Sequence, residues 1–423
     1  MLFSFFLLFV YIILFAYAIT KYSFFTKSGI TTKYLLLGYG IKLFGGFAYG
    51  YIYSHWYSGG DTWEYFSCSK LMHDAFYVNP RYYFQLVFGS CNYTSTDAEF
   101  LKITNPIAHW SDERTYFILR INAILQWFSF GNYYVHMVFW VFFSMLGTVG
   151  YYRTLNVYFP DYTTLMYVLL FLQPSIFFWA SGVHKDGLTL MALGLYVFAC
   201  QKILFDYKKW RFYALIALCL GVFYYFRPHL VVLLLPATIA WFWSEWYKGQ
   251  PKYKFAAIYV VSALLLVLLS YLSMNLNVFR KLMQIQYVFI VYTHGDGDIP
   301  IPFLQPTWQS ALVNLPMALY NTLITPFTNG ISRSIQHLLT SIESLVLLLL
   351  ILWATINYYL RPIKLVAFWY FCIALSISFL LLIGLTTDNI GAIVRYRTTI
   401  LPLLTPVLGV LTGLNNQRLS IKK

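Results

Sequence analysis

The chain has 423 residues, of which 60% are apolar and only 10% are charged, and its formal net charge is +14. Soluble globular domains carry roughly 25% charged residues, so this composition excludes an ordinary soluble protein and predicts an all-α, polytopic transmembrane bundle. Aromatic residues make up 21% of the chain. Many are Tyr and Trp near the ends of apolar runs, which is typical of membrane–water interfaces.

Apolar runs of about 17 to 25 residues recur along the chain and predict membrane-spanning helices. The first run lacks a basic leader and a small-residue cleavage site, so we expect it to be retained as a helix. We predict about eleven spans, and at most about thirteen, in a single integral membrane domain over 1–423. Their approximate ranges are 2–20, 34–53, 133–152, 162–180, 187–205, 212–226, 229–246, 255–274, 340–360, 365–385 and 399–415.

Two long connections, 54–132 and 275–339, separate groups of these spans. Each contains an amphipathic piece, at 116–128 and 315–327, which is predicted to be helical. Such a piece lies in the interface, re-enters the membrane or forms an extra short span, and the sequence leaves these alternatives open.

Basic residues concentrate in the short connections. The segments are "YKKWR" (207–211), "YKGQPKYK" (247–254), "RPIK" (361–364) and the tail "QRLSIKK" (417–423). This is the positive-inside pattern, so we predict a bacterial inner (plasma) membrane protein with a periplasmic N-terminus, a cytoplasmic C-terminus and both long connections outside. The positive charge then reflects topology and contact with membrane lipids, and no nucleic-acid partner is expected.

Three predicted helices begin at the outer face directly after basic residues. These residues are His184 and Lys185, then Arg227 and His229, then Arg395 and Arg397. A helix N-terminus already carries unpaired N–H groups and the positive end of the dipole, so added cations are unfavourable there unless an anion binds. We therefore predict that a substrate phosphate is bound by Lys185, Arg227, His229, Arg395 and Arg397.

A simpler interpretation of the same residues remains open. Basic side chains at helix ends often extend to lipid headgroups, and "HKDG" (184–187) also fits a turn capped by Asp186. Under this interpretation His184 and His229 are hydrogen-bonded structural residues.

The predicted catalytic residues are Asp61 and Glu64, in "GGDTWEYF" (59–66). The two glycines permit a tight turn that places Asp61 at the membrane surface. The alternative is a capping box, with Asp61 as the N-cap and Glu64 three positions later.

Other polar residues are weaker candidates for a functional site. Asp112, Asp388 and the segment 293–302 are less favoured sites, and a disulfide between Cys68 and Cys91 is left open. Because no metal-ligand spacing occurs, no metal ligands are assigned.

These groups suit one reaction at the outer face. A carboxylate can take a proton from a hydroxyl nucleophile, and basic residues can stabilise a departing phosphate. Aromatic grooves between helices suit an isoprenoid chain. We therefore expect a glycosyltransferase that uses a polyprenyl-phosphate-linked sugar donor and a glycan, lipid or protein acceptor in envelope glycan or glycoconjugate assembly.

The chain also resembles the GT-C superfamily of polytopic glycosyltransferases and the related bacterial envelope polysaccharide polymerases. The resemblance lies in "GGDTWEYF", in "PSIFFWASGVHKDGLTLMALGLYVF" (174–198) and in "RYRTTILPLL" (395–404). It implies that Asp61 is the base or a metal-associated acid, with Glu64 second. It also implies that Arg395 and Arg397, and then Arg227, lie near the lipid phosphate.

The chain departs from many members of the superfamily in two ways. Its first long outer connection follows span two, and that connection has no Asp-x-Asp pair. A requirement for a divalent cation is therefore left open. The alternatives are an O-antigen or exopolysaccharide polymerase, a transporter or flippase for an anionic lipid-linked substrate, and a non-catalytic scaffold.

Overall fold

The computed structural model describes residues 2–57, 59–90, 95–108, 110, 112–205, 209–292, 297–328 and 335–413, with the side chains of 335–337 excepted. Regular structure within these ranges is helical, with no strand and one isolated β-bridge between Asp298 and Asn389. The all-α prediction is confirmed.

Eight helices in the described ranges are long and apolar enough to cross a membrane, judged by length and composition. They are α1 (Leu2–Lys21), α3 (Thr32–Trp56), α8 (Tyr133–Tyr158), α11 (Lys185–Phe205), α13 (Pro228–Trp246), α14 (Pro251–Leu272), α19 (Ile335–Leu360) and α20 (Ala367–Thr386). Two further apolar helices, α12 (Trp210–Phe226) and α22 (Leu401–Leu411), are shorter. These helices support a membrane protein, while the full count of eleven spans stays a prediction.

The predicted span 162–180 is wrong as a continuous helix. It consists of α9 (Thr163–Phe171) and α10 (Pro174–Trp179), preceded by the short 3₁₀ helix η1 (Pro160–Tyr162). Gln173 is extended, with φ −67° and ψ 120°, because a residue before proline is disfavoured in the helical region. Pro174 then occupies the first turn of α10, where its missing N–H costs nothing.

The chain forms two compact units. The first unit comprises 1–153, 171–199 and 210–228, and the second comprises 154–170, 200–209 and 229–423. The C-terminal ends of α8 and α11 therefore belong to the second unit. Each unit has its own set of helix contacts.

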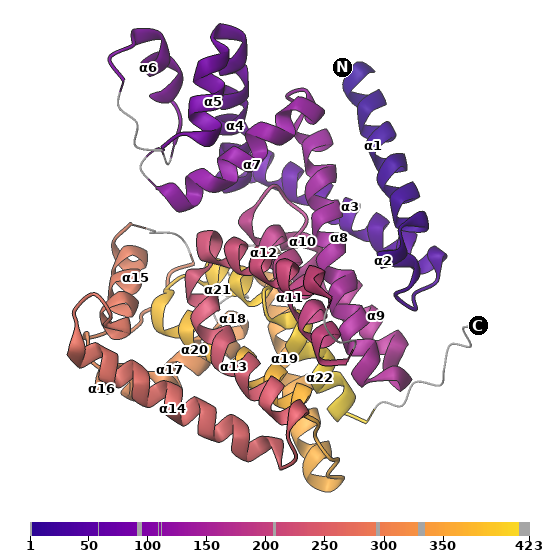
Figure 1. Ribbon diagram of the computed structural model, residues 1–423, viewed down its shortest axis with the longest axis vertical. Helices are drawn as coiled ribbons and strands as arrows, with labels where there is room; N and C mark the ends of the chain where they lie inside the picture. Colours follow the sequence, from indigo (N-terminus) through magenta and orange to yellow (C-terminus); the bar gives the residue numbers. More distant parts are fainter. Residues whose placement is uncertain are drawn as a thin grey trace. The chain divides into compact units, whose positions relative to one another are not determined.

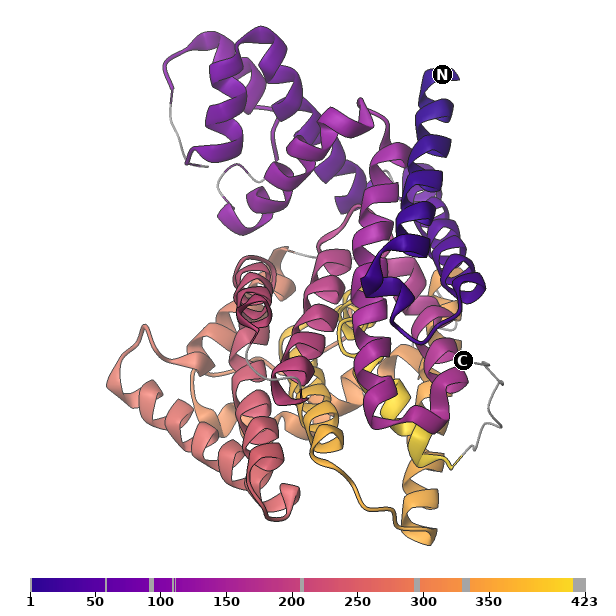
Figure 2. The same ribbon diagram turned by 45° about the vertical axis from the view of Figure 1, so that its right-hand side comes forward.

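The first unit contains α1, α3, α10, α12 and most of α8 and α11, together with helices of the first long connection. The latter are α4 (Gly60–Val78), α5 (Pro80–Phe88), α6 (Ala98–Thr104) and α7 (Glu113–Ser129), while α2 (Ser23–Thr26) follows α1. α1 lies alongside α8 (Figures 1 and 2), where Phe15 stacks on Phe142 with ring centroids 4.5 Å apart. The predicted amphipathic piece 116–128 lies within α7.

Buried polar side chains fix α7 between α4 and α8. His136 of α8 bonds Asn122 of α7 through Nε2 over 2.9 Å, and Trp140 Nε1 donates to the same Asn122 oxygen over 3.0 Å. Gln126 of α7 donates to Ser69 Oγ of α4 over 3.1 Å. Because buried polar groups are costly unless they are bonded, this network holds α7 in one register.

Glycines allow α8 and α11 to cross closely within the first unit. A Cβ on Gly194 would come within 2.1 Å of the Gly147 carbonyl oxygen, and a Cβ on Gly147 within 2.5 Å of Met191 Cα. Small residues at helix crossings let two backbones approach in membrane proteins. The α8–α11 crossing therefore has no room for larger side chains at these positions.

The second unit packs α20 against several helices of the second long connection and the C-terminal region. Its remaining helices are α15 (Val278–Tyr292), α16 (Trp308–Val313), α17 (Leu315–Leu323), α18 (Thr325–Thr328) and α21 (Ile390–Arg397). A Cβ on Gly384 of α20 would lie 2.0 Å from the Ala318 carbonyl oxygen of α17, so α17 lies directly on α20. The predicted piece 315–327 is α17 and most of α18.

Substituting Gly194→Ala should lower the stability of the chain by about 1–3 kcal/mol, because the added methyl overfills the α8–α11 crossing. Gly40→Ala on α3 and Gly221→Ala on α12 are matched controls, since a Cβ at either position meets nothing within 4 Å. Both controls should leave stability unchanged or slightly raised. Thermal unfolding in detergent measures the difference, and equal melting temperatures for all three variants would contradict the crossing.

Candidate functional site

Two glycines turn the chain between α3 and α4 and position Asp61. Gly59 has φ +98° and Gly60 has φ +52°, conformations that favour glycine. The Gly59 N–H donates to the Tyr53 carbonyl oxygen over 2.7 Å, which closes the turn. A Cβ on Gly60 would lie 2.7 Å from the Tyr53 ring. The first turn of α4 is therefore held beside the end of α3.

Asp61 lies inside the first turn of α4. The helix begins at Gly60, and its N-cap, Gly59, has no side-chain capping bond, so the alternative of a capping box with Asp61 as N-cap is wrong. A carboxylate in this turn is favoured by the helix dipole. The Asp61 side chain is 44% exposed, and Glu64 is exposed three residues later on α4.

The segment "ASGVH" (180–184) is a buried turn between α10 and α11. A Cβ on Gly182 would lie 2.3 Å from the Tyr49 ring of α3, so glycine lets the turn pack closely on that helix. His184 ends the turn, and its side chain is 2% exposed. Its Nε2 lies 3.1 Å from Asp61 Oδ2, and its Nδ1 lies 2.9 Å from Asp186 Oδ2. The imidazole thus stands between two carboxylates.

Asp186 is a buried carboxylate that is paired with Arg227. Arg227 Nη2 donates to Asp186 Oδ1 over 2.8 Å, and the side chains are 11% and 2% exposed. Arg227 directly follows α12, and its N–H donates to the Phe223 carbonyl oxygen over 2.7 Å. Because a buried charge is costly without a partner, this pair ties the start of α11 to the end of α12.

Lys185, which follows His184, belongs to a second series of hydrogen-bonded side chains. Its Nζ donates to Thr115 Oγ1 of α7 over 2.6 Å and lies 5.5 Å from the centre of the Tyr65 ring. The Thr115 hydroxyl in turn donates to Asp112 Oδ2. Asp112 also caps α7 by accepting from the Arg114 N–H over 3.2 Å.

The Asp112 carboxyl is kept ionised by these contacts. Burial raises its pKa, but hydrogen bonds from Thr115 and the Arg114 N–H, together with the charge of Lys185, outweigh burial and leave the pKa below its ordinary value. Lys185 is partly exposed, and its bond to the Thr115 hydroxyl connects it to α7.

The predicted site residues divide between the two units. Asp61, Glu64, Lys185 and Arg227 belong to the first unit, where Asp61 and Arg227 are connected through His184 and Asp186. The other three predicted residues, His229, Arg395 and Arg397, belong to the second unit.

Within the second unit, Arg397 is a buried side chain that holds helices together. It is 1% exposed, and it donates from Nη1 to the Thr322 carbonyl oxygen and from Nη2 to Ser344 Oγ, over 2.9 and 2.8 Å. These bonds join α21 to α17 and α19. The His229 ring stacks on Phe379 with centroids 6.0 Å apart.

The observed helix boundaries contradict the prediction that three helices begin with basic residues that oppose the helix dipole. Arg395 and Arg397 lie in the last turn of α21, where the dipole favours cations. Lys185 opens α11, but Asp186 in the same turn supplies the acid that a helix start prefers. Arg227 is balanced by that same acid. The dipole alone therefore does not require an external anion.

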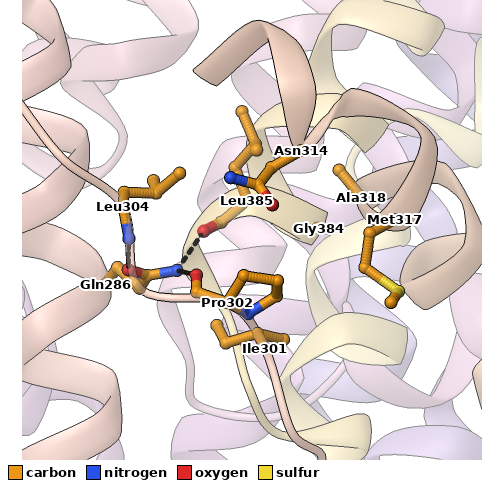
Figure 3. Close-up of a pocket in the computed structure, with 9 residues that line it drawn as sticks. All are labelled: Gln286, Ile301, Pro302, Leu304, Asn314, Met317, Ala318, Gly384 and Leu385. Carbon is orange, nitrogen blue, oxygen red and sulfur yellow. Dashed lines mark hydrogen bonds between the residues drawn. The ribbon is translucent and has the colours of Figure 1, made fainter. Parts of the chain in front are cut away.

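A cavity of about 10 Å³, close to the smallest that can hold one water, lies in the second unit. Figure 3 shows Gln286 at its edge, donating from Nε2 to the carbonyl oxygens of Pro302 and Leu385 over 2.9 and 3.0 Å. The Leu304 N–H donates back to Gln286 Oε1 over 2.8 Å. Gln286 thus anchors a loop to the end of α20, and the cavity is too small for a sugar.

Within the described ranges, no group of three or more His, Cys, Asp or Glu side chains could hold a metal ion. The weaker candidate segment 293–302 is only partly described, and 293–296 lie outside the described residues. Cys91 also lies outside them, so the pairing with Cys68 is not described. Asp388, another weaker candidate, is buried, and its carbonyl oxygen accepts from the Ile299 N–H over 2.6 Å.

Comparisons with protein-family models, with curated proteins and with solved structures find no match to this chain.

The residues predicted from sequence to form the site include neither His184 nor Thr115, although both contact predicted site residues. The signal for His184 was present in "HKDG", because three ionisable residues in succession are unusual beside an apolar span. The Thr115 contact had no such signal, since its partner Lys185 is 70 residues away in sequence.

Replacing Thr115→Val should destabilise the chain by about 1–3 kcal/mol, because both Lys185 and Asp112 lose a hydrogen-bond partner while the side-chain volume is kept. Thr115→Ser retains the hydroxyl and is the matched control, expected to recover most of the loss. The measurement is the melting temperature of each variant in the same detergent. Equal effects of the two substitutions would contradict the Lys185–Thr115–Asp112 chain.

Proposed function

We propose that the chain is a bacterial inner-membrane glycosyltransferase that moves a sugar from a polyprenyl-phosphate-linked donor to an acceptor at the periplasmic face. The observation that carries the proposal is the Asp61 carboxylate. It is 44% exposed, lies in the first turn of α4 and accepts a hydrogen bond from a buried histidine. A carboxylate that is both accessible and oriented has the properties of a general base.

In this reaction Asp61 takes the proton of the acceptor hydroxyl as the oxygen attacks the anomeric carbon of the donor sugar. The new C–O bond forms with the electron pair of that oxygen, and the bond from the anomeric carbon to the phosphate oxygen breaks. The leaving polyprenyl phosphate carries away the bonding pair. A nearby cation that neutralises this developing charge lowers the barrier.

Lys185 is the proposed phosphate contact of the first unit. It is partly exposed and fixed by Thr115, and it directly follows His184 in the chain. Arg227 is proposed to act indirectly, because its guanidinium is bonded to Asp186. The predicted phosphate contacts Arg395 and Arg397 belong to the second unit, where Arg397 holds α21 in place.

The proposed topology has eleven spans, with the N-terminus in the periplasm and the C-terminus in the cytoplasm. The eight long helices, together with α12 and α22, account for ten of them. The interrupted pair α9 and α10 is proposed as the eleventh. In this arrangement the turn before α4 and the turn before α11 both face the periplasm.

A polysaccharide polymerase is the second candidate, and the position of His184 favours it. In such an enzyme the histidine and the basic residues would carry the reaction, and the Asp61 carboxylate would be less important. The donor would then be a lipid-linked oligosaccharide.

Asp61→Asn tests the proposal with the purified chain in proteoliposomes and a panel of radiolabelled undecaprenyl-phosphate hexoses. The rate of sugar transfer should fall by about 100-fold or more, because the amide cannot accept the proton. Asp74→Asn is the matched control, since Asp74 lies on the same helix and is 49% exposed. It should keep the wild-type rate.

The outcomes separate the candidates. Transfer by Asp61→Asn at the wild-type rate would contradict a base at this position. The same variant polymerising lipid-linked oligosaccharide normally would support the second candidate. Movement of the labelled lipid across the bilayer without any sugar transfer would support a flippase.

A further inference from the structure

His184 connects an accessible carboxylate to a buried ion pair. Its Nε2 is bonded to Asp61 Oδ2 over 3.1 Å, and its Nδ1 lies 2.9 Å from Asp186 Oδ2, with the Asp186 N–H also directed at Nδ1 over 3.4 Å. Asp186 Oδ1 accepts from Arg227 over 2.8 Å. Carboxylate, imidazole, carboxylate and guanidinium thus follow one another from the exposed end of the cluster to its buried end.

The surroundings leave the imidazole little freedom. The His184 side chain is 2% exposed, and the Tyr65 ring of α4 lies 5.7 Å from it, centroid to centroid. The turn 180–184 that carries it is buried throughout. Asp186 is also 2% exposed, and Arg227 keeps its charge at any ordinary pH. The Asp186 side chain is thereby held as a fixed anchor for the ring.

Asp61 differs from these residues because its side chain is 44% exposed. A carboxylate side chain that is open to solvent samples several rotamers, and a bond to a fixed donor selects one of them. Because a carboxylate only accepts hydrogen bonds, the ring nitrogen that faces Asp61 carries the hydrogen. Oδ2 is thus the Asp61 oxygen that is bound to the ring.

We propose that His184 is a positioning residue that holds the Asp61 carboxylate through Oδ2 in the orientation in which it takes the proton of the acceptor hydroxyl, with Asp186 and Arg227 fixing the ring from the buried side. The catalytic part rests on the proposed function. During transfer the acceptor proton goes to the Asp61 carboxylate, while His184 keeps the hydrogen on Nε2. The imidazole therefore touches neither the sugar nor the phosphate.

Two substitutions separate positioning from folding. His184→Gln keeps an N–H donor at nearly the place of Nε2, whereas His184→Leu fills a similar space without a donor. We expect His184→Leu to lower kcat by 10- to 100-fold with KM within about threefold. His184→Gln should recover kcat to within about fivefold of the wild type.

A second readout does not depend on any transferase activity. A hydrophobic carbodiimide modifies accessible carboxyl groups, and peptide mass spectrometry reports the extent at Asp61 relative to Asp74 on the same helix. Labelling of Asp61 should rise about threefold or more in His184→Leu, because the carboxylate loses the Nε2–H donor that stabilises its ionised form. His184→Gln should label at close to the wild-type rate.

Each outcome decides a part of the inference. If Asp61 labels equally in the wild type and in His184→Leu, the positioning contact is overturned. If labelling rises but kcat is unchanged, the catalytic role is overturned. If the wild type shows no sugar transfer, the proposed function fails, while the labelling ratio still decides whether His184 positions Asp61.

Discussion

The first unit's polar cluster depends on one constraint, which is that the buried carboxylate of Asp186 requires a cation beside it. Asp186 is almost fully enclosed at the start of α11, and Arg227 at the end of α12 supplies the opposing charge. Because a lone buried charge costs several kcal/mol, the two helix ends must meet. Their meeting fixes the turn 180–184, and the turn in turn places His184 against Asp61 on α4.

Much of the architecture follows from apolar periodicity alone. Long apolar runs predicted the helical class and the positions of the eight long helices, because the length needed to cross a bilayer is a local property of the sequence. The break inside 162–180 falls at Pro174, which interrupts an apolar run long enough to predict a single helix. The glycine pair before Asp61 predicted its turn correctly, since both residues adopt positive φ.

The site was less predictable because its contacts are not local. His184 and Asp61 are 123 residues apart in sequence, so no local pattern in either segment predicts that the two residues are in contact. The argument from helix dipoles depended on helix boundaries, and these placed Arg395 and Arg397 at the end of α21 instead of the start of the next helix. Arg227 was predicted to bind a substrate phosphate, and in the structure its guanidinium is bonded to Asp186 of the same chain.

A double-mutant cycle between Asp186 and Arg227 tests the central constraint most directly. Stability is measured in detergent for Asp186→Asn, for Arg227→Gln and for the double variant. A buried ion pair predicts a loss of about 3–5 kcal/mol for each single change, and a double variant that loses at least about 2 kcal/mol less than the sum. Additive losses would contradict the account, because the two side chains would then not depend on each other.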